Sequence, residues 1–219
     1  MLKPLLDKLP LPQRNLWDEL AAVPPDFVLY GGTALALRLG HRISEDFDFF
    51  SNEEMLPDDL ERRISFLQQS VRLQSSSNTL VSTLDRDGQV KVSFFGGLNL
   101  RRVQDPETAE GPGILVASLL DLAATKVKVV QDRAEAKDYQ DVFSLLDAGI
   151  ELAHALAAAR AVYGPTFNPL LSMKALSYFG DGDLPSLPAA VRSRLSAAVA
   201  NVDVARLPDI HPLPGGLLP

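Results

Sequence analysis

The feature that most constrains this chain is the pentapeptide DFDFF at residues 46–50, in which acidic and aromatic side chains alternate. A period of two places Asp46, Asp48 and Phe50 on one face of a strand and the other two phenylalanines on the opposite face. Such a strand buries its aromatic face in a core and leaves its acidic face open. The segment therefore predicts a half-buried strand whose carboxylates face a ligand.

A glycine pair precedes this strand. FVLYGG is a short apolar run that ends in Gly31 and Gly32, a pattern typical of a buried strand followed by a tight turn. The next segment, TALALRLG, predicts a short helix with Thr33 near its start and Gly40 at its end. Glycines let backbone N–H groups approach a polyphosphate, and the positive end of the helix dipole favours anions there. The pattern indicates a phosphate site beside the carboxylates.

Two carboxylates on one strand face repel each other, and a divalent cation relieves that repulsion. Magnesium is the natural candidate, because it accepts one or two protein carboxylates and completes its shell with substrate phosphates and water. A pair of such ions would activate an attacking hydroxyl and stabilise departing pyrophosphate. Without the glycine pair, Asp46 and Asp48 would be interpreted as a turn cap and a solvated edge residue.

Composition excludes several other kinds of site. The chain has no cysteine, so disulfides, thiolate metal sites and a cysteine nucleophile are excluded, and its three scattered histidines argue against a histidine-rich zinc site. A net charge of −7 argues against a broad basic surface for nonspecific binding of nucleic acid. No segment approaches the roughly 20 apolar residues of a membrane span, and the first residues do not have the pattern of a signal peptide. We expect a cytoplasmic protein with no membrane partner.

The remaining pattern predicts an α+β fold, a mixed sheet with helices followed by a helical lobe. An amphipathic helix is expected over 57–70, and three strands between 71 and 95, the last two joined by the turn at 85–88. Helices are expected at roughly 117–131, 137–148, 151–162, 169–179 and 188–200. We assign residues 1–112 to the α/β core, 113–205 to the helical lobe and 206–219 to an irregular or loosely attached tail rich in proline and glycine.

Two segments carry a family resemblance. YGGTALALRLGHRISEDFDFF resembles the signature of the AbiEii-type nucleotidyltransferase toxins, within the DNA polymerase β-like nucleotidyltransferase superfamily. LLDLAATKVKVVQDRAEAKDYQDVFSLL resembles the lysine-containing helix, basic link and Lys/Arg-Asp-x-x-Asp helix of that family. The resemblance implies a nucleotidyltransferase core at 1–112, with the lobe at 113–205 completing the active site. It also implies transfer of a nucleoside monophosphate from an NTP to an RNA 3′ end, such as that of tRNA, or to a protein hydroxyl. The biological role would be the toxin of a bacterial toxin–antitoxin or phage-defence pair, with a cognate antitoxin as partner.

The resemblance also assigns site residues. Catalytic roles fall to Asp46, Asp48, Lys126 and Asp141, the first two as ligands of Mg²⁺ or Mn²⁺. The resemblance gives Gly31 and Gly32 a phosphate-binding role, and we add as nucleotide-binding candidates Thr33, Arg42, Ser44 and Arg133. Lys126 would act on the phosphates or on transition-state charge, and Asp141 would orient it or assist the acceptor. Arg42 is equally well interpreted as a polar connector, and Ser44 as a turn residue. If 117–148 were one helix, Lys126, Arg133 and Lys137 would form one stripe. This stripe is either part of the nucleotide site or only a solvated basic face.

One departure from the superfamily pattern affects the chemistry. A third acidic residue is common on a later strand, where this chain has the sequence KVSF at 91–94. Ser93 cannot replace a carboxylate as a charged ligand. Either one metal ion suffices, or another acid such as Asp141 completes the site, or catalysis is weakened.

Two alternative functions therefore stay open. One is a catalytically inactive nucleotidyltransferase fold that serves as a binding module, which the serine at position 93 motivates. The other is a metal-dependent glycosyltransferase with a DxD motif, which would explain the two carboxylates but neither the glycine pair nor the lysine-containing helix.

Overall fold

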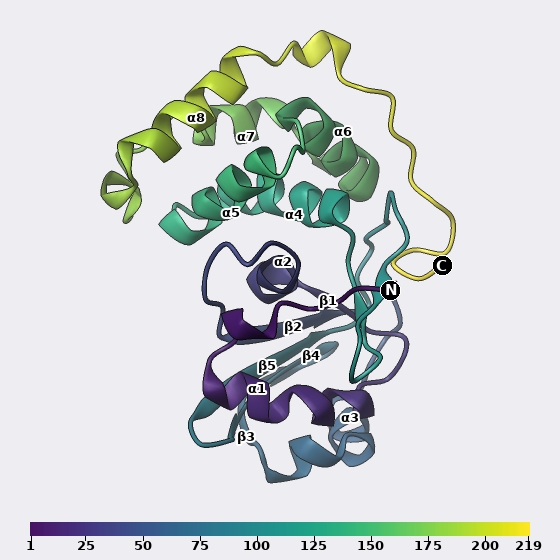
Figure 1. Ribbon diagram of the computed structural model, residues 1–219. Coiled ribbons are helices and arrows are strands. Elements are labelled where there is room, and N and C mark those ends of the chain that lie inside the picture. Colours follow the sequence, from purple (N-terminus) through teal and green to yellow (C-terminus); the bar gives the residue numbers. More distant parts are fainter. The chain divides into compact units, whose positions relative to one another are not determined.

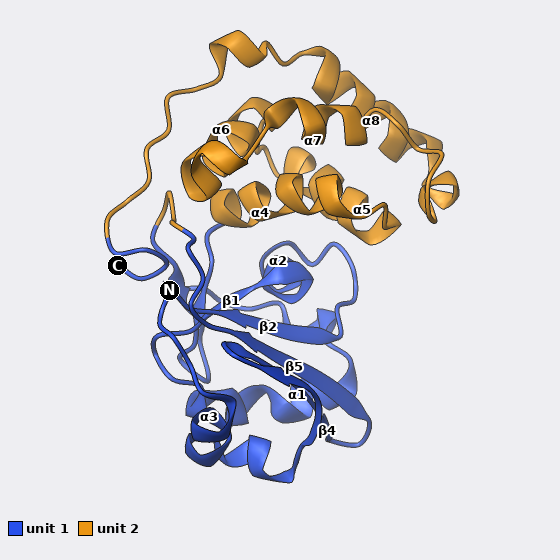
Figure 2. Ribbon diagram, turned by 180° about the vertical axis from the view of Figure 1, so that it is seen from behind, with its two compact units in different colours: residues 1–100, 105–118, 215–219 blue, residues 101–104, 119–214 orange.

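The computed structural model describes residues 1–219, which form two compact units. Unit 1 consists of residues 1–100, 105–118 and 215–219, and unit 2 of residues 101–104 and 119–214 (Figure 2). The first unit contains all of the strands, and the second contains five α-helices. The α+β class predicted from the sequence is confirmed.

Unit 1 is built on one seven-stranded mixed sheet with the strand order β3-β4-β5-β2-β1-β7-β6. The strands are β1 (Val28–Tyr30), β2 (Asp46–Phe50), β3 (Val71–Ser76), β4 (Thr79–Asp85), β5 (Gln89–Phe95), β6 (Glu107–Thr108) and β7 (Leu115–Val116). The central strand β2 pairs antiparallel with β1 and parallel with β5. The acidic strand therefore has a neighbour on each side, and these neighbours determine what surrounds its carboxylates.

Helices cover both faces of this sheet. They are α1 (Leu11–Leu16), α2 (Gly31–Leu39) and α3 (Pro57–Arg63), with 3₁₀ turns at Leu6–Lys8, Trp17–Ala22 and Ser65–Gln69. In Figure 1, α2 lies on one side of the sheet, and α1 and α3 lie on the other. Phe47 and Phe49 of β2 are fully buried, and Phe49 stacks on Phe94 of β5 with ring centroids 5.2 Å apart. This aromatic layer is the core that the alternation in DFDFF predicts.

The helix expected over 57–70 is interrupted. The α-helix ends at Arg63, and Ile64 has extended backbone (φ −101°, ψ 110°) before the 3₁₀ turn begins. Ile64, Phe66 and Leu67 are all buried. One straight helix would not bury all three, because positions 64 and 66 point to different sides of a helix.

Unit 2 consists of the helices α4 (Leu119–Asp132), α5 (Ala136–Asp147), α6 (Leu152–Tyr163), α7 (Pro169–Ala175) and α8 (Ala189–Ala200). Helix α4 is central, because it packs against α5, α6 and α7. Its apolar side chains Leu122, Val127 and Val130 are buried. The chain leaves the helical conformation at 133–135, so the continuous helix considered for 117–148 does not form.

The last residues of the chain pack more closely than the loose attachment that the sequence suggested. Residues 207–219 form no helix or strand, yet Leu217 is only 1% exposed and its backbone N–H donates to Asn52 Oδ1 at 2.6 Å. The Asn52 side chain also donates to the backbone carbonyls of Leu98 and Leu100. A buried leucine and one asparagine thus fasten residues 215–219 to unit 1.

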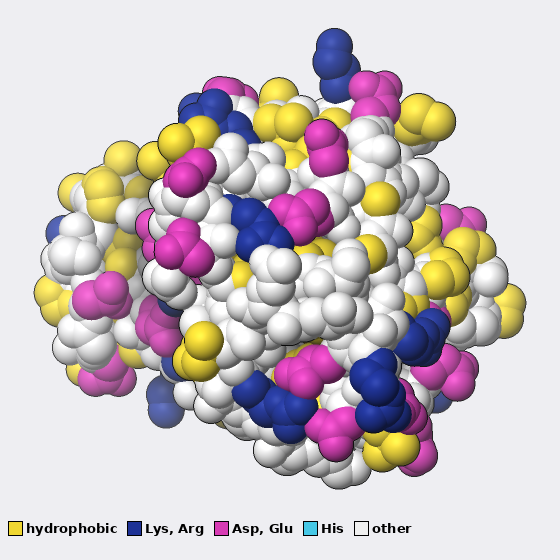
Figure 3. Space-filling model, turned by 90° about the horizontal axis from the view of Figure 1, so that it is seen from below, with side chains coloured by type: hydrophobic (Ala, Val, Ile, Leu, Met, Phe, Trp, Pro, Cys, Tyr) yellow, Lys and Arg dark blue, Asp and Glu magenta, His cyan; other side chains and the backbone are white.

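Surface charges of opposite sign lie close together in unit 1. Figure 3 shows the molecule from below the view of Figure 1, with acidic side chains beside basic ones and no continuous basic field on that face. Ion pairs of this kind join Arg86 to Glu19 and Arg72 to Glu61. No helix of the chain is by itself long and apolar enough to cross a membrane.

Candidate active site

The first candidate cluster, the carboxylate site, consists of Asp46, Asp48, Lys91 and Ser93 on β2 and β5. The two aspartates share the partly exposed face of β2. The parallel register places Lys91 beside Asp46 and Ser93 beside Asp48. Lys91 Nζ lies 2.7 Å from Asp46 Oδ2, and Ser93 is 2% exposed. Strand β5 therefore adds an ammonium group and a neutral hydroxyl to the two carboxylates.

The glycine pair lies against this site. Tyr30, the last residue of β1, pairs with Asp48, and α2 begins directly at Gly31 rather than after a separate turn. Gly31 has φ +76°, and a Cβ atom on it would lie 2.8 Å from Asp48 Oδ2. Glycine is required here, because other residues rarely adopt this backbone conformation and their Cβ atom would clash with the carboxylate. The Asp48 carboxylate thus rests on the first turn of α2.

Arg42 occupies the equivalent space over the second glycine. A Cβ atom on Gly32 would clash with Arg42 Nη2 and would lie 3.2 Å from Ser44 Oγ. A guanidinium group and a carboxylate therefore lie over adjacent glycines at the amino end of α2. Positive charge at this position favours an anionic ligand.

Thr33 and Ser44 connect α2 to the acidic strand. Thr33 Oγ1 donates to the backbone carbonyl of Asp46 and lies 2.9 Å from Ser44 Oγ. Both side chains are buried. These contacts fix the start of β2 against α2, so the two hydroxyls have a positioning role in the protein. Their nucleotide-binding role is a proposal.

The donor set of the carboxylate site fits a hard divalent cation. Two carboxylates on one face are what Mg²⁺ takes from a protein when substrate phosphates and water supply its remaining ligands. The chain has no cluster of three or more histidine, aspartate or glutamate side chains arranged to hold a metal ion. An ion at Asp46 and Asp48 would therefore depend on the nucleotide for part of its coordination.

The second candidate cluster, the lysine cluster, lies within unit 2 and consists of Lys126, Arg133, Asp138 and Asp141. Lys126 Nζ on α4 lies 2.8 Å from Asp138 Oδ1 and 2.6 Å from Asp141 Oδ2 on α5. Lys126 is 5% exposed and both aspartates are fully buried. Residues three apart share a helix face, which is why both carboxylates reach one ammonium group.

Asp138 was missed by the sequence interpretation, which selected only Asp141 from KDYQD. Arg133 Nε donates to Asp138 Oδ2 at 2.7 Å, so Asp138 accepts from two cations. Burial alone would raise the pKa of Asp138, but the hydrogen bond from Arg133 and the charge of Lys126 outweigh it and hold that pKa below its ordinary value. The signal that would have found Asp138 is the i, i+3 spacing of the two aspartates.

The basic stripe considered for Lys126, Arg133 and Lys137 is not formed. Helix α4 ends at Asp132, Arg133 lies in the link, and Lys137 belongs to α5. Lys137 is exposed and pairs with Glu135 at 2.8 Å. Lys126 and Arg133 therefore meet at Asp138, whereas Lys137 lies apart from them and is exposed to solvent.

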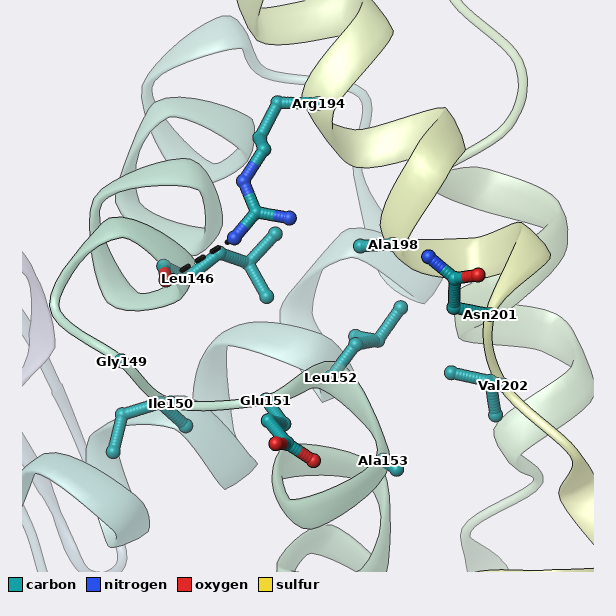
Figure 4. Close-up of a pocket in the computed structure, with 10 residues that line it drawn as sticks. All are labelled: Leu146, Gly149, Ile150, Glu151, Leu152, Ala153, Arg194, Ala198, Asn201 and Val202. Carbon is teal, nitrogen blue, oxygen red and sulfur yellow. Dashed lines mark hydrogen bonds between the residues drawn. The ribbon is translucent and has the colours of Figure 1, made fainter.

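Unit 2 also has two hollows. One, of about 370 Å³, lies among α4, α5, α7 and the segments that follow α4 and α7. Its charged and exposed aromatic lining residues are Asp132, Arg133, Lys174, Tyr178 and Asp181. The other, of about 490 Å³, lies between the end of α5, the start of α6 and α8 (Figure 4). There Arg194 Nη2 donates a hydrogen bond to the backbone carbonyl of Leu146, with a nitrogen–oxygen distance of 3.4 Å. Only the first hollow contains a residue that the sequence selected, Arg133.

The mixed sheet, the acidic strand and the glycine-started helix define a nucleotidyltransferase fold. It is shared by the nucleotidyltransferase toxin MenT4 of Mycobacterium tuberculosis H37Rv, with a TM-score of 0.63 and 16% identity over 86% of this chain and 83% of that one. A crystal structure of a candidate nucleotidyltransferase from H. pylori has a TM-score of 0.55 and 17% identity over 86% of this chain and 91% of that one.

The family described as "Nucleotidyl transferase AbiEii toxin, Type IV TA system" matches residues 15–205, and the chain belongs to this family. This chain is 35% identical to an uncharacterized protein of Aquifex aeolicus strain VF5. The match extends over 143 residues, which are 64% of this chain and 68% of that protein. The resemblance seen in the two sequence segments is thereby confirmed. The protein is a nucleotidyltransferase, and a type IV toxin–antitoxin family implies a nucleotide substrate and an antitoxin partner. The glycosyltransferase alternative is set aside.

Proposed function

We propose that this protein transfers a nucleoside monophosphate from an NTP to an acceptor hydroxyl, with a divalent cation held by Asp46 and Asp48. The acceptor oxygen bonds to the α-phosphorus, the bond from that phosphorus to the bridging oxygen breaks, and pyrophosphate leaves while the hydroxyl proton passes to solvent. The observation that carries this proposal is the Asp48 carboxylate resting on Gly31 at the start of α2. That contact puts a metal ligand beside a ready anion site.

Each group of the carboxylate site has a role in this proposal. A bound Mg²⁺ or Mn²⁺ would neutralise charge on the transferring phosphate. The backbone N–H groups of Gly31 and Gly32 bind phosphate oxygens, and Arg42 adds positive charge over Gly32. Thr33 and Ser44 hold α2 against the acidic strand, so that the glycines and carboxylates keep their spacing. Asp46 and Asp48 would hold this cation.

The proposal extends to the lysine cluster. Lys126 supplies positive charge to the triphosphate or to the transition state, and Asp138 and Asp141 hold its ammonium group in place. A buried, doubly paired lysine is preorganised, because its orientation is set before the substrate binds. On this account residues 1–112 are the nucleotidyltransferase core, and the helical lobe at 113–205 contributes Lys126.

We further propose that the acceptor is an RNA end, such as the 3′ end of tRNA, and that the protein is the toxin of a bacterial toxin–antitoxin or phage-defence pair. Support comes from the hollow at Arg133, Lys174 and Tyr178, which Asp132 and Asp181 also line. Two cations and an exposed aromatic ring are groups that bind the phosphate and the base of a single-stranded nucleic acid. A protein hydroxyl is the competing acceptor.

The test is incubation of the purified protein with Mg²⁺, each α-³²P-labelled NTP in turn, and either total RNA or a protein extract. We expect label in the RNA together with release of pyrophosphate, and none with EDTA. Label in protein alone would replace the RNA acceptor by a protein hydroxyl. If no NTP gives labelled product while nucleotide binding persists without metal, the inactive binding module is the better description.

A further inference from the structure

The surroundings of Asp46 and Asp48 on the sheet contain no further acid. On β5, the residues beside them are Lys91 and Ser93. On β1, Tyr30 lies opposite Asp48. Residues paired across neighbouring strands point to the same side of a sheet, so these are the side chains that share the carboxylate face. A third acidic ligand from either adjacent strand is therefore absent.

The next strand along does not supply one either. In β4, Val81 pairs with Ser93, and Thr83 pairs with Lys91. Ser93 itself is 2% exposed and neutral. The row of side chains that runs from β1 to β4 across this face thus contains two negative charges and one positive charge, and the positive charge belongs to Lys91.

Lys91 stands beside Asp46 on β5, where an acidic residue would give the site a third carboxylate. Its ammonium nitrogen is 2.7 Å from Asp46 Oδ2, at the separation of a direct charge-assisted hydrogen bond. Two carboxylates are already balanced by the Lys91 ammonium group and by the Arg42 guanidinium group over Gly32, so one divalent ion brings the site to a positive charge before the nucleotide binds. A second divalent ion would be held by Asp46 alone and repelled by the neighbouring ammonium and by the first ion.

We propose that the carboxylate site holds a single divalent cation and that Lys91 replaces the second ion of a two-metal arrangement. Lys91 is a positioning residue in this proposal, because it neutralises Asp46 and fixes that carboxylate through a hydrogen bond. The inference rests on the proposed function, since it concerns the cation of the same reaction. It predicts that the residue at position 91 decides how many ions the site takes.

The test counts metal ions rather than turnover. Mn²⁺ is titrated into the full-length protein in the presence of the α,β-methylene analogues of ATP, CTP, GTP and UTP, and binding is followed by electron paramagnetic resonance. Ions of a two-metal site lie about 3.5–4 Å apart and give a spin-coupled spectrum, whereas a single ion does not. We expect one uncoupled Mn²⁺ per chain in the parent protein, beyond the Mn²⁺ bound by free nucleotide.

Two variants separate charge from ligand identity. Lys91→Glu supplies a third carboxylate and should bind a second, spin-coupled Mn²⁺, whereas Lys91→Gln removes the charge without adding a ligand and should bind one. Lys91 is partly exposed, so both are expected to fold, and thermal melting checks this. A Lys91→Glu protein that folds and still binds one ion would overturn the inference.

The parent protein gives an answer without either variant. Two coupled Mn²⁺ ions in the parent would overturn the single-ion inference and leave the proposed transferase function intact. Absence of any nucleotide-dependent Mn²⁺ binding would overturn both. One uncoupled Mn²⁺ per chain supports the inference. The transfer assay should then depend on Mg²⁺ concentration with a Hill coefficient near one.

Discussion

The ammonium group of Lys126 lies 2.6 Å from a carboxylate oxygen of Asp141, and both side chains are buried. Asp138 contacts the same ammonium group at 2.8 Å. A substitution that removes the Lys126 ammonium group takes this contact away from the buried carboxylates of Asp138 and Asp141. The stability of unit 2 and the proposed chemistry of Lys126 are therefore coupled.

We predict that Lys126→Met destabilises the protein by about 3–5 kcal/mol, because it takes the ammonium group away from two buried carboxylates, and such a loss is much more unfavourable than that of a surface contact. Lys128→Met is the matched control, since Lys128 pairs with Asp132 at the edge of the same helix and should change stability by less than about 1 kcal/mol. Urea unfolding measures both. Equal effects of the two substitutions would show that the cluster in the structure is not stabilising in solution.

Loss of activity in Lys126→Met alone would not separate catalysis from folding. The double variant Lys126→Met with Asp138→Asn removes one of the two carboxylates that contact Lys126 and leaves the other, so it should recover part of the lost stability, less the contact of Asp138 with Arg133. If Lys126 acts on the phosphates, this double variant stays at least about 100-fold less active than the parent protein. Recovery of activity together with stability would assign Lys126 a purely structural role.

The lowered pKa of Asp138 predicts a specific loss of stability in acid. The unfolded chain binds a proton at this carboxyl near its ordinary pKa of about 3.9, while the folded protein does so only at lower pH. The stabilisation is therefore fully present above about pH 4 to 5 and is lost as the pH falls through the folded-state pKa. Melting temperatures from pH 6 to pH 2 should fall more steeply for the parent than for Asp138→Asn. Parallel curves would contradict the pairing.

Gly31→Ala should impair both stability and transfer. The substitution adds backbone strain at φ +76° and places a methyl group 2.8 Å from Asp48 Oδ2, which must move. Gly113 is a matched control, with φ +74° and nothing within 4 Å of an added Cβ atom. Both alanine variants should lose about 1 kcal/mol or more from strain, but only Gly31→Ala should lose most of its transfer activity. Equal activities would show that Asp48 does not depend on this contact.

Local features of the site were predictable from sequence, because they depend on residues close together in the chain. The alternation in DFDFF required Phe47 and Phe49 to be buried, and they are. The left-handed Gly40, at φ +62°, ends α2 as its position predicts. Each of these depends on at most a few neighbouring residues.

Features that depend on distant pairings were not predictable. The position of Lys91 beside Asp46 follows from the parallel pairing of β5 with β2, which one sequence does not reveal. Asp138 was missed because a lysine partner on another helix, twelve residues away, gives it its environment. The break at Ile64 arises because burial of neighbouring apolar side chains outweighs helix continuity.

The most direct test of the central claim is the rate of nucleotide transfer by Asp48→Asn, measured with α-³²P-labelled NTPs and RNA at saturating Mg²⁺. The matched control is Glu45→Gln, which removes one negative charge from an exposed side chain next to the same strand. Asp48→Asn should fold as stably as the parent, because it relieves repulsion between carboxylates. Its transfer rate should fall at least about 100-fold, since a ligand of the catalytic cation is lost, while Glu45→Gln stays within about three-fold of the parent. A folded Asp48→Asn protein that transfers nucleotide at nearly the parent rate would contradict the assignment of Asp48 as a metal ligand.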